Sequence, residues 1–233
     1  MDVSRLLEII RIKIDDFDDT EDELFTDDEL IYYINNALAE AAFRGKLFVK
    51  ENYSLELVPG QREYSVPANV ISITQILDED KRDVNKIQEV DFEQTIYHSC
   101  ADNAFSNTST SNDWRKDTDS LPYYFMQNTT NNKLVFYPIP NKISVVTMRG
   151  WYLPVVVESD DELPAELSPI YQHDLIYWVL FECYDKQDAD VHHPGKAEEN
   201  KQRFAEVFGE KMTADVFQEV LEYPDDPGSL RSY

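Results

Sequence analysis

The spacing of apolar residues changes twice along this 233-residue chain. Residues 3–14, and the segment that follows Thr26, repeat apolar side chains every three or four positions, as one face of a helix requires. From about Tyr53 to Tyr152 the spacing falls to two residues, which is typical of strands with one buried face. Helical spacing returns after Ser168. This order predicts an α+β fold in which helices from both chain ends pack together around a central β-rich insertion.

Composition along the chain divides it further. A stretch rich in Ser, Thr, Asn and Asp has no apolar period, which is typical of a long loop. The C-terminal residues contain Pro and Gly in a pattern that suits an extended arm. We predict an N-terminal helical part (1–50), a central β-rich part (51–160) with a polar loop (99–122), a C-terminal helical part (161–212) that packs with the first, and an extended C-terminal arm (213–233).

Capping residues predict where the helices begin and end. Thr26 with Glu29 has the spacing of a capping box, and Gly45 is expected to take the left-handed conformation that ends the second helix. Ser168 before Pro169 predicts the start of one long helix with an apolar centre. A last helix is expected from about Pro194 to Met212.

Turn residues predict the strands and their pairing. Pro59-Gly60 lies between two alternating segments, which predicts a β-hairpin across this pair. A second hairpin is expected across the Asn/Thr-rich turn that follows Met126. The strands of this second hairpin are expected at 123–126 and 133–137. Further strands are expected at 70–77, 82–87 and 143–152, and a short helix at 91–97.

The charge excludes several classes of protein. The chain has 46 Asp and Glu against 21 Lys and Arg, a net charge of −25, so the basic surface of a nucleic-acid-binding protein is absent. The most apolar run, Leu175–Phe181, is too short to span a bilayer, and we expect a soluble protein with no export signal and no membrane contact. Cys100 and Cys183 are interpreted as free thiols in a reducing compartment.

Ten carboxylates lie between Asp15 and Glu29, and calcium is the first ligand to consider for such a run. The run lacks the glycine at the sixth position and the alternating Asp/Asn spacing of an EF-hand. We therefore predict a solvated acidic loop and no metal site.

Catalytic signatures are weak. Acidic pairs such as Glu162/Glu166 and Asp160/Asp161 have the chemistry for glycoside cleavage, but pairs at any spacing arise by chance among so many carboxylates. His192-His193 has no further His nearby to complete a metal site, and the chain has no nucleophile elbow, phosphate-binding loop or dinucleotide motif. We predict that the chain is not an enzyme and has no catalytic residue and no cofactor.

Five segments follow one another along the chain in a recognisable order. They are DDELIYYINNALAEAAFRGKLF, GQREYSVPANVISITQI, KLVFYPIPN, VVTMRGWY and ELPAELSPIYQHDLIYWVLFECY. By the order and spacing of these segments, the chain resembles the head-to-tail adaptor proteins of short-tailed bacteriophages. The resemblance covers roughly residues 20–210.

The resemblance implies a structural virion protein at the head–tail junction, assembled in the host bacterial cytoplasm. Such a protein forms a homo-oligomeric ring, typically of twelve copies, beneath the portal protein, and offers a platform for a tail tube or nozzle protein. It also implies that the C-terminal arm binds the portal. The arm residues expected to bind are Phe217, Leu221, Tyr223, Leu230, Arg231 and Tyr233.

A ring around a DNA channel gives the acidity a purpose. Carboxylates that face the lumen repel phosphate, so DNA passes through during ejection without specific binding. Two other functions stay open at this point. The chain could be an acidic DNA-mimic inhibitor of a basic enzyme, or a cell-wall hydrolase that uses two carboxylates as acid and base.

Overall fold

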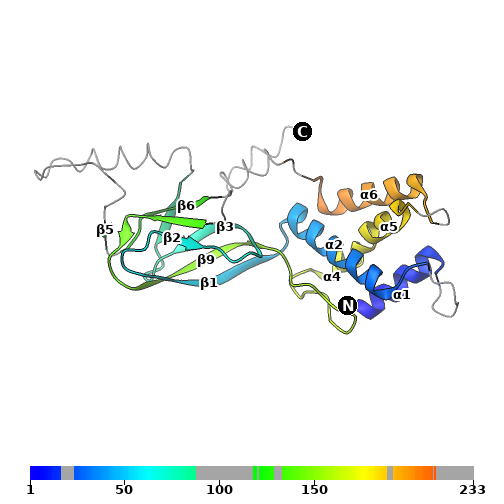
Figure 1. The fold of residues 1–233 in the computed structure, drawn as a ribbon, viewed down its shortest axis with the longest axis horizontal. Coiled ribbons are helices and arrows are strands. Elements are labelled where there is room, and N and C mark those ends of the chain that lie inside the picture. Colours follow the sequence, from blue (N-terminus) through cyan, green and yellow to red (C-terminus); the bar gives the residue numbers. More distant parts are fainter. Residues whose placement is uncertain are drawn as a thin grey trace, which may run out of the picture. The chain divides into compact units, whose positions relative to one another are not determined.

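A computed structural model describes residues 1–16, 24–87, 118–119, 121–128, 133–187, 191–211 and 213. The chain divides into two compact units. The helical unit is Met1–Phe48 with Leu153–Met212, and we use the name sheet unit for Val49–Tyr152 of the second unit. The elements of each are shown in Figure 1. The predicted α+β class with a central β-rich region is confirmed, because strands occupy the middle of the chain and helices flank them in sequence.

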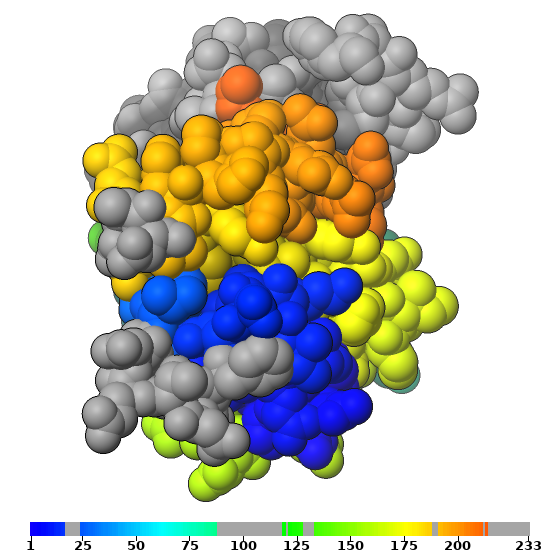
Figure 2. Space-filling model, turned by 90° about the vertical axis from the view of Figure 1, so that its right-hand side faces the viewer, coloured from blue at the N-terminus to red at the C-terminus, as the bar shows by residue number. Residues whose placement is uncertain are grey.

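The helical unit combines helices from both chain ends. Its elements are α1 (Val3–Ile14), α2 (Asp27–Gly45), α4 (Pro169–Gln172), α5 (Leu175–Asp185) and α6 (Pro194–Phe208). Helix α5 packs against α1, α2 and α6, so it forms the centre of the unit. Figure 2 shows α1 in blue and α6 in orange on one face, with yellow residues of the α4–α5 region between them. None of the helices in the described part of the chain is long and apolar enough to cross a membrane.

The sheet unit contains one seven-stranded sheet and one two-stranded sheet among its described residues. The order in the larger sheet is β1-β9-β3-β4-β6-β7-β2, and β5 pairs with β8. The β4–β6 and β5–β8 pairs are parallel and the other described pairs are antiparallel. The strands are β1 (Val49–Leu57), β2 (Glu63–Ser65), β3 (Val70–Leu77), β4 (Asp83–Lys86), β5 (Thr118–Asp119), β6 (Tyr124–Asn128), β7 (Lys133–Tyr137), β8 (Ile139–Pro140) and β9 (Ser144–Tyr152).

One face of the sheet carries the core of this unit. Strand β9 buries every second residue from Ser144 to Gly150, and its inward valine and methionine join a large apolar cluster from β1, β3, β6 and β7. Gly150 is required by close packing, because a Cβ atom at this position would lie 2.3 Å from the carbonyl oxygen of Ser72 on β3.

Most of the predicted elements are confirmed within two residues. The helix at 3–14, the strands at 70–77 and 82–87, and the hairpin of β6 with β7 are all present. The Thr26 hydroxyl accepts the Glu29 N–H at 3.3 Å, as the predicted cap requires. The left-handed residue that ends α2 is Lys46, with a φ of 49°, so the prediction that Gly45 takes this conformation is wrong.

The hairpin predicted across Pro59-Gly60 is wrong. The turn forms, with Gly60 at a φ of 79°, but β1 pairs with β9 and β2 pairs with β7. The turn is held by its surroundings, since the Gly60 N–H donates to the Pro140 carbonyl oxygen at 2.8 Å. Local spacing identified both strands but not their partners, because β9 and β7 lie far along the chain from β1 and β2.

The single long helix predicted after Ser168 is two helices, because the chain turns at His173 and Asp174 between α4 and α5. The Ser168 side chain makes no capping hydrogen bond, although Pro169 occupies the first turn as expected. Helix α6 ends at Phe208 and not at the predicted Met212. The next residue, Gly209, has a φ of 92°. The predicted helix at 91–97 and most of loop 99–122 lie outside the described residues, and residues 118–119 of that loop form β5.

Candidate assembly surfaces

The C-terminal arm was predicted as the portal-binding segment. Its candidate residues lie outside the described part of the chain: Phe217, Leu221, Tyr223, Leu230, Arg231 and Tyr233. The described chain leads to the start of this arm, through Lys211 and the exposed Thr213. The described contacts that bear on the arm are therefore those of Gly209 and Lys211, just before it, which we call the arm root.

The root of the arm is attached to the C-terminal end of α2. The Lys211 ammonium donates to Glu40 Oε1 at 2.7 Å, and the Arg44 Nε donates to Glu40 Oε2 at 2.9 Å. Arg44 also donates to the Gly209 carbonyl oxygen at 3.4 Å. Its guanidinium is buried over the Trp178 ring, 4.8 Å from the centroid. These contacts fix the last turn of α6, and with it the place where the arm begins.

Glu40 stays ionised in this position. Burial on its own would raise the pKa of the Glu40 carboxyl, but the hydrogen bonds from Lys211 and Arg44 outweigh it, so the pKa is lowered. A permanent negative charge on Glu40 keeps both cations in place at neutral pH.

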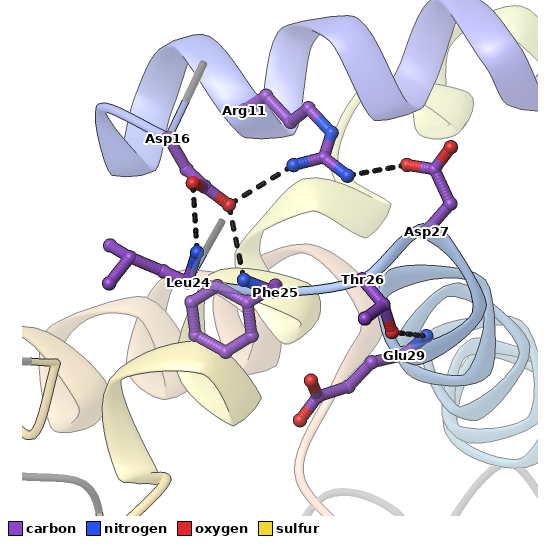
Figure 3. Close-up of polar contacts among 7 residues, drawn as sticks. All are labelled: Arg11, Asp16, Leu24, Phe25, Thr26, Asp27 and Glu29. Atoms are coloured by element: carbon purple, nitrogen blue, oxygen red, sulfur yellow. Dashed lines mark hydrogen bonds and ion pairs between the residues drawn. The ribbon is translucent and has the colours of Figure 1, made fainter. Parts of the chain in front are cut away.

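The buried Arg11 side chain pairs with a carboxylate near each end of the acidic run (Figure 3). Arg11 of α1 donates to Asp16 Oδ2 at 3.1 Å and to Asp27 Oδ1 at 2.6 Å. Asp16 also accepts the backbone N–H groups of Leu24 and Phe25, at 3.1 and 3.2 Å. One arginine and two aspartates thus connect α1 to the start of α2.

This network corrects the prediction that the whole acidic run is solvated. Asp16 is only 3% exposed, because Arg11 and two backbone amides replace its water contacts. The sequence contained a signal, since Arg11 lies four residues after Leu7 and three before Ile14, on the apolar face of α1. A buried arginine requires a carboxylate partner, and the adjacent run supplies it.

A second set of polar contacts involves α5. Lys186, which caps its C-terminal end, pairs with Glu29 of α2 at 2.8 Å. Within α5, the Trp178 indole N–H donates to Glu182 Oε1 at 3.0 Å. Burial raises the pKa of Glu182, and hydrogen bonds from Trp178 and Asn36 offset only part of this effect. Burial also raises the pKa of the Cys183 thiol to about 12, so this free cysteine is an unreactive core residue. Cys100 lies outside the described residues.

The chain that re-enters the helical unit is held by one amide side chain. Asn35 Oδ1 accepts the Val157 N–H at 2.9 Å, and Asn35 Nδ2 donates to the Val157 carbonyl oxygen at 3.0 Å. Val157 is buried, whereas Val155 and Val156 are 77% and 72% exposed. Spacing did not predict this exposed apolar pair, because the Val-Val-Val run has no period.

The acidic pairs considered for catalysis lie at the surface. Asp160, Asp161, Glu162 and Glu166 are all exposed, and the Asp161 carboxylate accepts the Glu158 N–H at 2.8 Å. His193 is exposed and its Nδ1 accepts the Lys196 N–H at 3.3 Å, so it caps α6. Within the described ranges, no group of three or more His, Cys, Asp or Glu side chains could hold a metal ion.

A family model described as "SU10 adaptor protein" matches residues 1–225, which include both units and part of the arm. Among curated proteins, none matches the chain.

Proposed function

Since this chain belongs to the SU10 adaptor protein family and is a phage structural adaptor, we propose that it forms the ring that joins the head to the tail of a short-tailed phage. The ring, typically of twelve copies, attaches beneath the portal protein. Its other side is the platform for a tail tube or nozzle protein. The observation that carries this proposal is the family match over residues 1–225.

The arm is the proposed portal contact. Glu40 and Arg44 bind Gly209 and Lys211, so the arm starts from a fixed point on α2. A fixed start reduces the conformational entropy that binding has to remove. The apolar and aromatic anchors are Phe217, Leu221, Tyr223, Leu230 and Tyr233, and Arg231 adds a charged contact.

The acidity suits a channel through which DNA moves. The helical unit has 27 Asp and Glu against 10 Lys and Arg, so most of the net charge belongs to it. We place part of this excess on the channel wall, where it lowers the affinity for phosphate. Reversal of lumen carboxylates to Lys should then slow genome ejection, and unchanged ejection kinetics would contradict this placement.

The test is co-sedimentation of the chain with the portal ring encoded in the same genome, followed by imaging of the complex. We expect a ring stacked coaxially on the portal, with a copy number that can be counted directly. A chain that lacks residues 213–233 should keep its fold and lose portal attachment. Absence of binding at micromolar concentrations, with both proteins folded, would overturn the proposal.

A further inference from the structure

Strand β1 is an edge strand of the larger sheet in the described part of the chain. Among the described strands, β1 pairs only with β9, at one end of the strand order. The Val145 N–H of β9 donates to Glu79 Oε1 at 3.0 Å, and Glu79 follows β3, on the side of β9 away from β1. Backbone polar groups alternate sides along an antiparallel strand, so those of Ser144 and Val146 face β1.

The same alternation fixes which groups of β1 face outward. Leu55 and Leu57 lie opposite Val146 and Ser144, so their N–H and C=O groups face β9. Those of Ser54 and Glu56 then point away from the sheet. Val58 continues this alternation, because its N–H donates to the Tyr64 hydroxyl at 2.8 Å and its C=O accepts the Gln61 N–H.

Ser54 and Glu56 have exposed side chains, and their outward backbone groups have no partner among the described residues. An open strand edge of this kind is a template for another strand. At the other end of the sheet, the Glu63 carbonyl oxygen on β2 already accepts the Gln61 side chain at 2.9 Å.

A second segment of the chain has complementary features. Asn35 holds both backbone groups of Val157, so the trans peptide before Val157 directs the Val156 carbonyl oxygen away from α2. The side chains of Val155 and Val156 are largely exposed, and neither backbone has a partner in the described part of the chain. Consecutive valines favour the strand conformation.

We propose that Val155–Val156 of one copy adds as a short antiparallel strand to Ser54–Glu56 on the β1 edge of the next copy. This inference rests on the proposed ring. The two surfaces are different, so each copy offers one to each neighbour, and a heterologous contact of this type forms a ring when the rotation between successive copies closes. Strand addition provides main-chain hydrogen bonds at a site where valine side chains also become buried.

Charge selects the antiparallel orientation. No Lys or Arg occurs from Gly150 to Asp185, and residues 158–162 contain four exposed carboxylates. Antiparallel pairing places these carboxylates beside the start of β1, where Lys50 and Arg149 are exposed and Arg149 pairs with Glu51 at 3.2 Å, so two cations face one carboxylate there. Parallel pairing would place them beyond Glu56, next to a like charge.

Cysteine cross-linking tests the contact. Chains with Ser54→Cys are mixed with chains with Val156→Cys, assembled on the portal ring and oxidised. We expect disulfide-linked dimers in at least fivefold higher yield than in a control mixture of Ser65→Cys with Val156→Cys. Ser65 is also exposed on an edge strand, but on β2. Samples that contain only one of the variants give the background yield of disulfides that involve Cys100.

Imaging of the same samples separates the two proposals. Rings without cross-links above the control would overturn the strand pairing and leave the adaptor function intact. Failure of the unmodified chain to form rings on the portal would overturn both. A chain that carries both Ser54→Cys and Val156→Cys is a further test. A disulfide between these two residues within one monomer would overturn the pairing between copies.

A proline variant tests the hydrogen bonds themselves. Ser54→Pro removes an outward N–H and leaves the β1–β9 ladder intact. We expect it to keep the far-ultraviolet spectrum of the natural chain and to need at least tenfold higher concentration to form rings. Ring formation at the natural concentration would contradict the proposal.

Discussion

The helical unit and the sheet unit are nearly equal in length, 108 and 104 residues, but they differ in charge. The helical unit has a net charge of −17, from 27 acidic and 10 basic residues, and the sheet unit has −4, from 14 and 10. The two units therefore depend on different interactions. A folded chain with so many like charges needs its few cations at specific places, whereas the sheet depends mainly on apolar packing.

Burial shows the same difference. Among the described residues, the helical unit buries Arg11, Asp16 and Arg44, while Asp78 is the buried charge of the sheet unit. Loss of one buried charge leaves its partner without compensation. Charge substitutions should therefore affect the helical unit most, and volume changes should affect the sheet unit most.

The largest effect is expected for Asp16→Ala. The change removes a buried partner of Arg11 and the acceptor for two backbone amides, so the free energy of unfolding of the helical unit should fall by about 3 kcal/mol. Hydrogen exchange of α1 and α2 measures this loss, and exchange in β9 should stay unchanged.

The adjacent carboxylate is the matched control. Asp15 is exposed and has a φ of 61°, a conformation that Asn also tolerates, so Asp15→Asn should change stability by less than about 0.5 kcal/mol. Equal losses for the two variants would show that the acidic run acts only through net charge.

The next largest effect is expected in the sheet unit, for Gly150→Ala. The new methyl group would contact the Ser72 carbonyl oxygen, and β9 or β3 must move, at a cost of about 2 kcal/mol. In the helical unit, Gly195→Ala should stabilise α6 by up to about 1 kcal/mol, because its Cβ would meet nothing closer than 3.7 Å. Chemical denaturation measures both, and effects of equal sign would contradict the packing argument.

These residues also show what the sequence could predict. Periodicity predicted α1, β3 and β9 because each buries one face along a continuous segment. It also identified β1 and β2 but not their pairing, since strand pairing depends on which distant strand is available. For the assembly surfaces, the placement of Arg11 was readable from the helical face of α1, but the anchor of Glu40, Arg44 and Lys211 joins residues far apart in the chain.

A smaller effect that depends on pH is expected for Glu182→Gln. Burial raises the pKa of Glu182, so the folded chain holds this proton more tightly than the unfolded chain. Stability therefore falls as pH rises from the ordinary carboxyl range through the raised pKa. The glutamine still accepts the Trp178 N–H, so the variant should be more stable at pH 7 and should lack this dependence.

Unfolding free energies between pH 4 and 7 test this expectation. Glu206→Gln is the control, because Glu206 is exposed on α6. A parallel pH profile for the natural chain and Glu182→Gln would show that Glu182 is solvated in the folded protein.

The smallest effect is expected for Lys211→Ala, because Lys211 is exposed and an exposed ion pair contributes less than about 1 kcal/mol. The variant should also change how the stability of the protein depends on pH. The lowered pKa of Glu40 contributes stability above the ordinary carboxyl pKa, and this is lost as pH falls through the folded value. Without Lys211, the Glu40 pKa should rise and the loss of stability on acidification should shrink.

Arg44→Ala should lower the free energy of unfolding more than Lys211→Ala at every pH, because it also removes the hydrogen bond to Gly209 and the contact with Trp178. Equal effects of the two variants would show that exposed charge alone holds the arm root, and that the buried Arg44 side chain contributes nothing more.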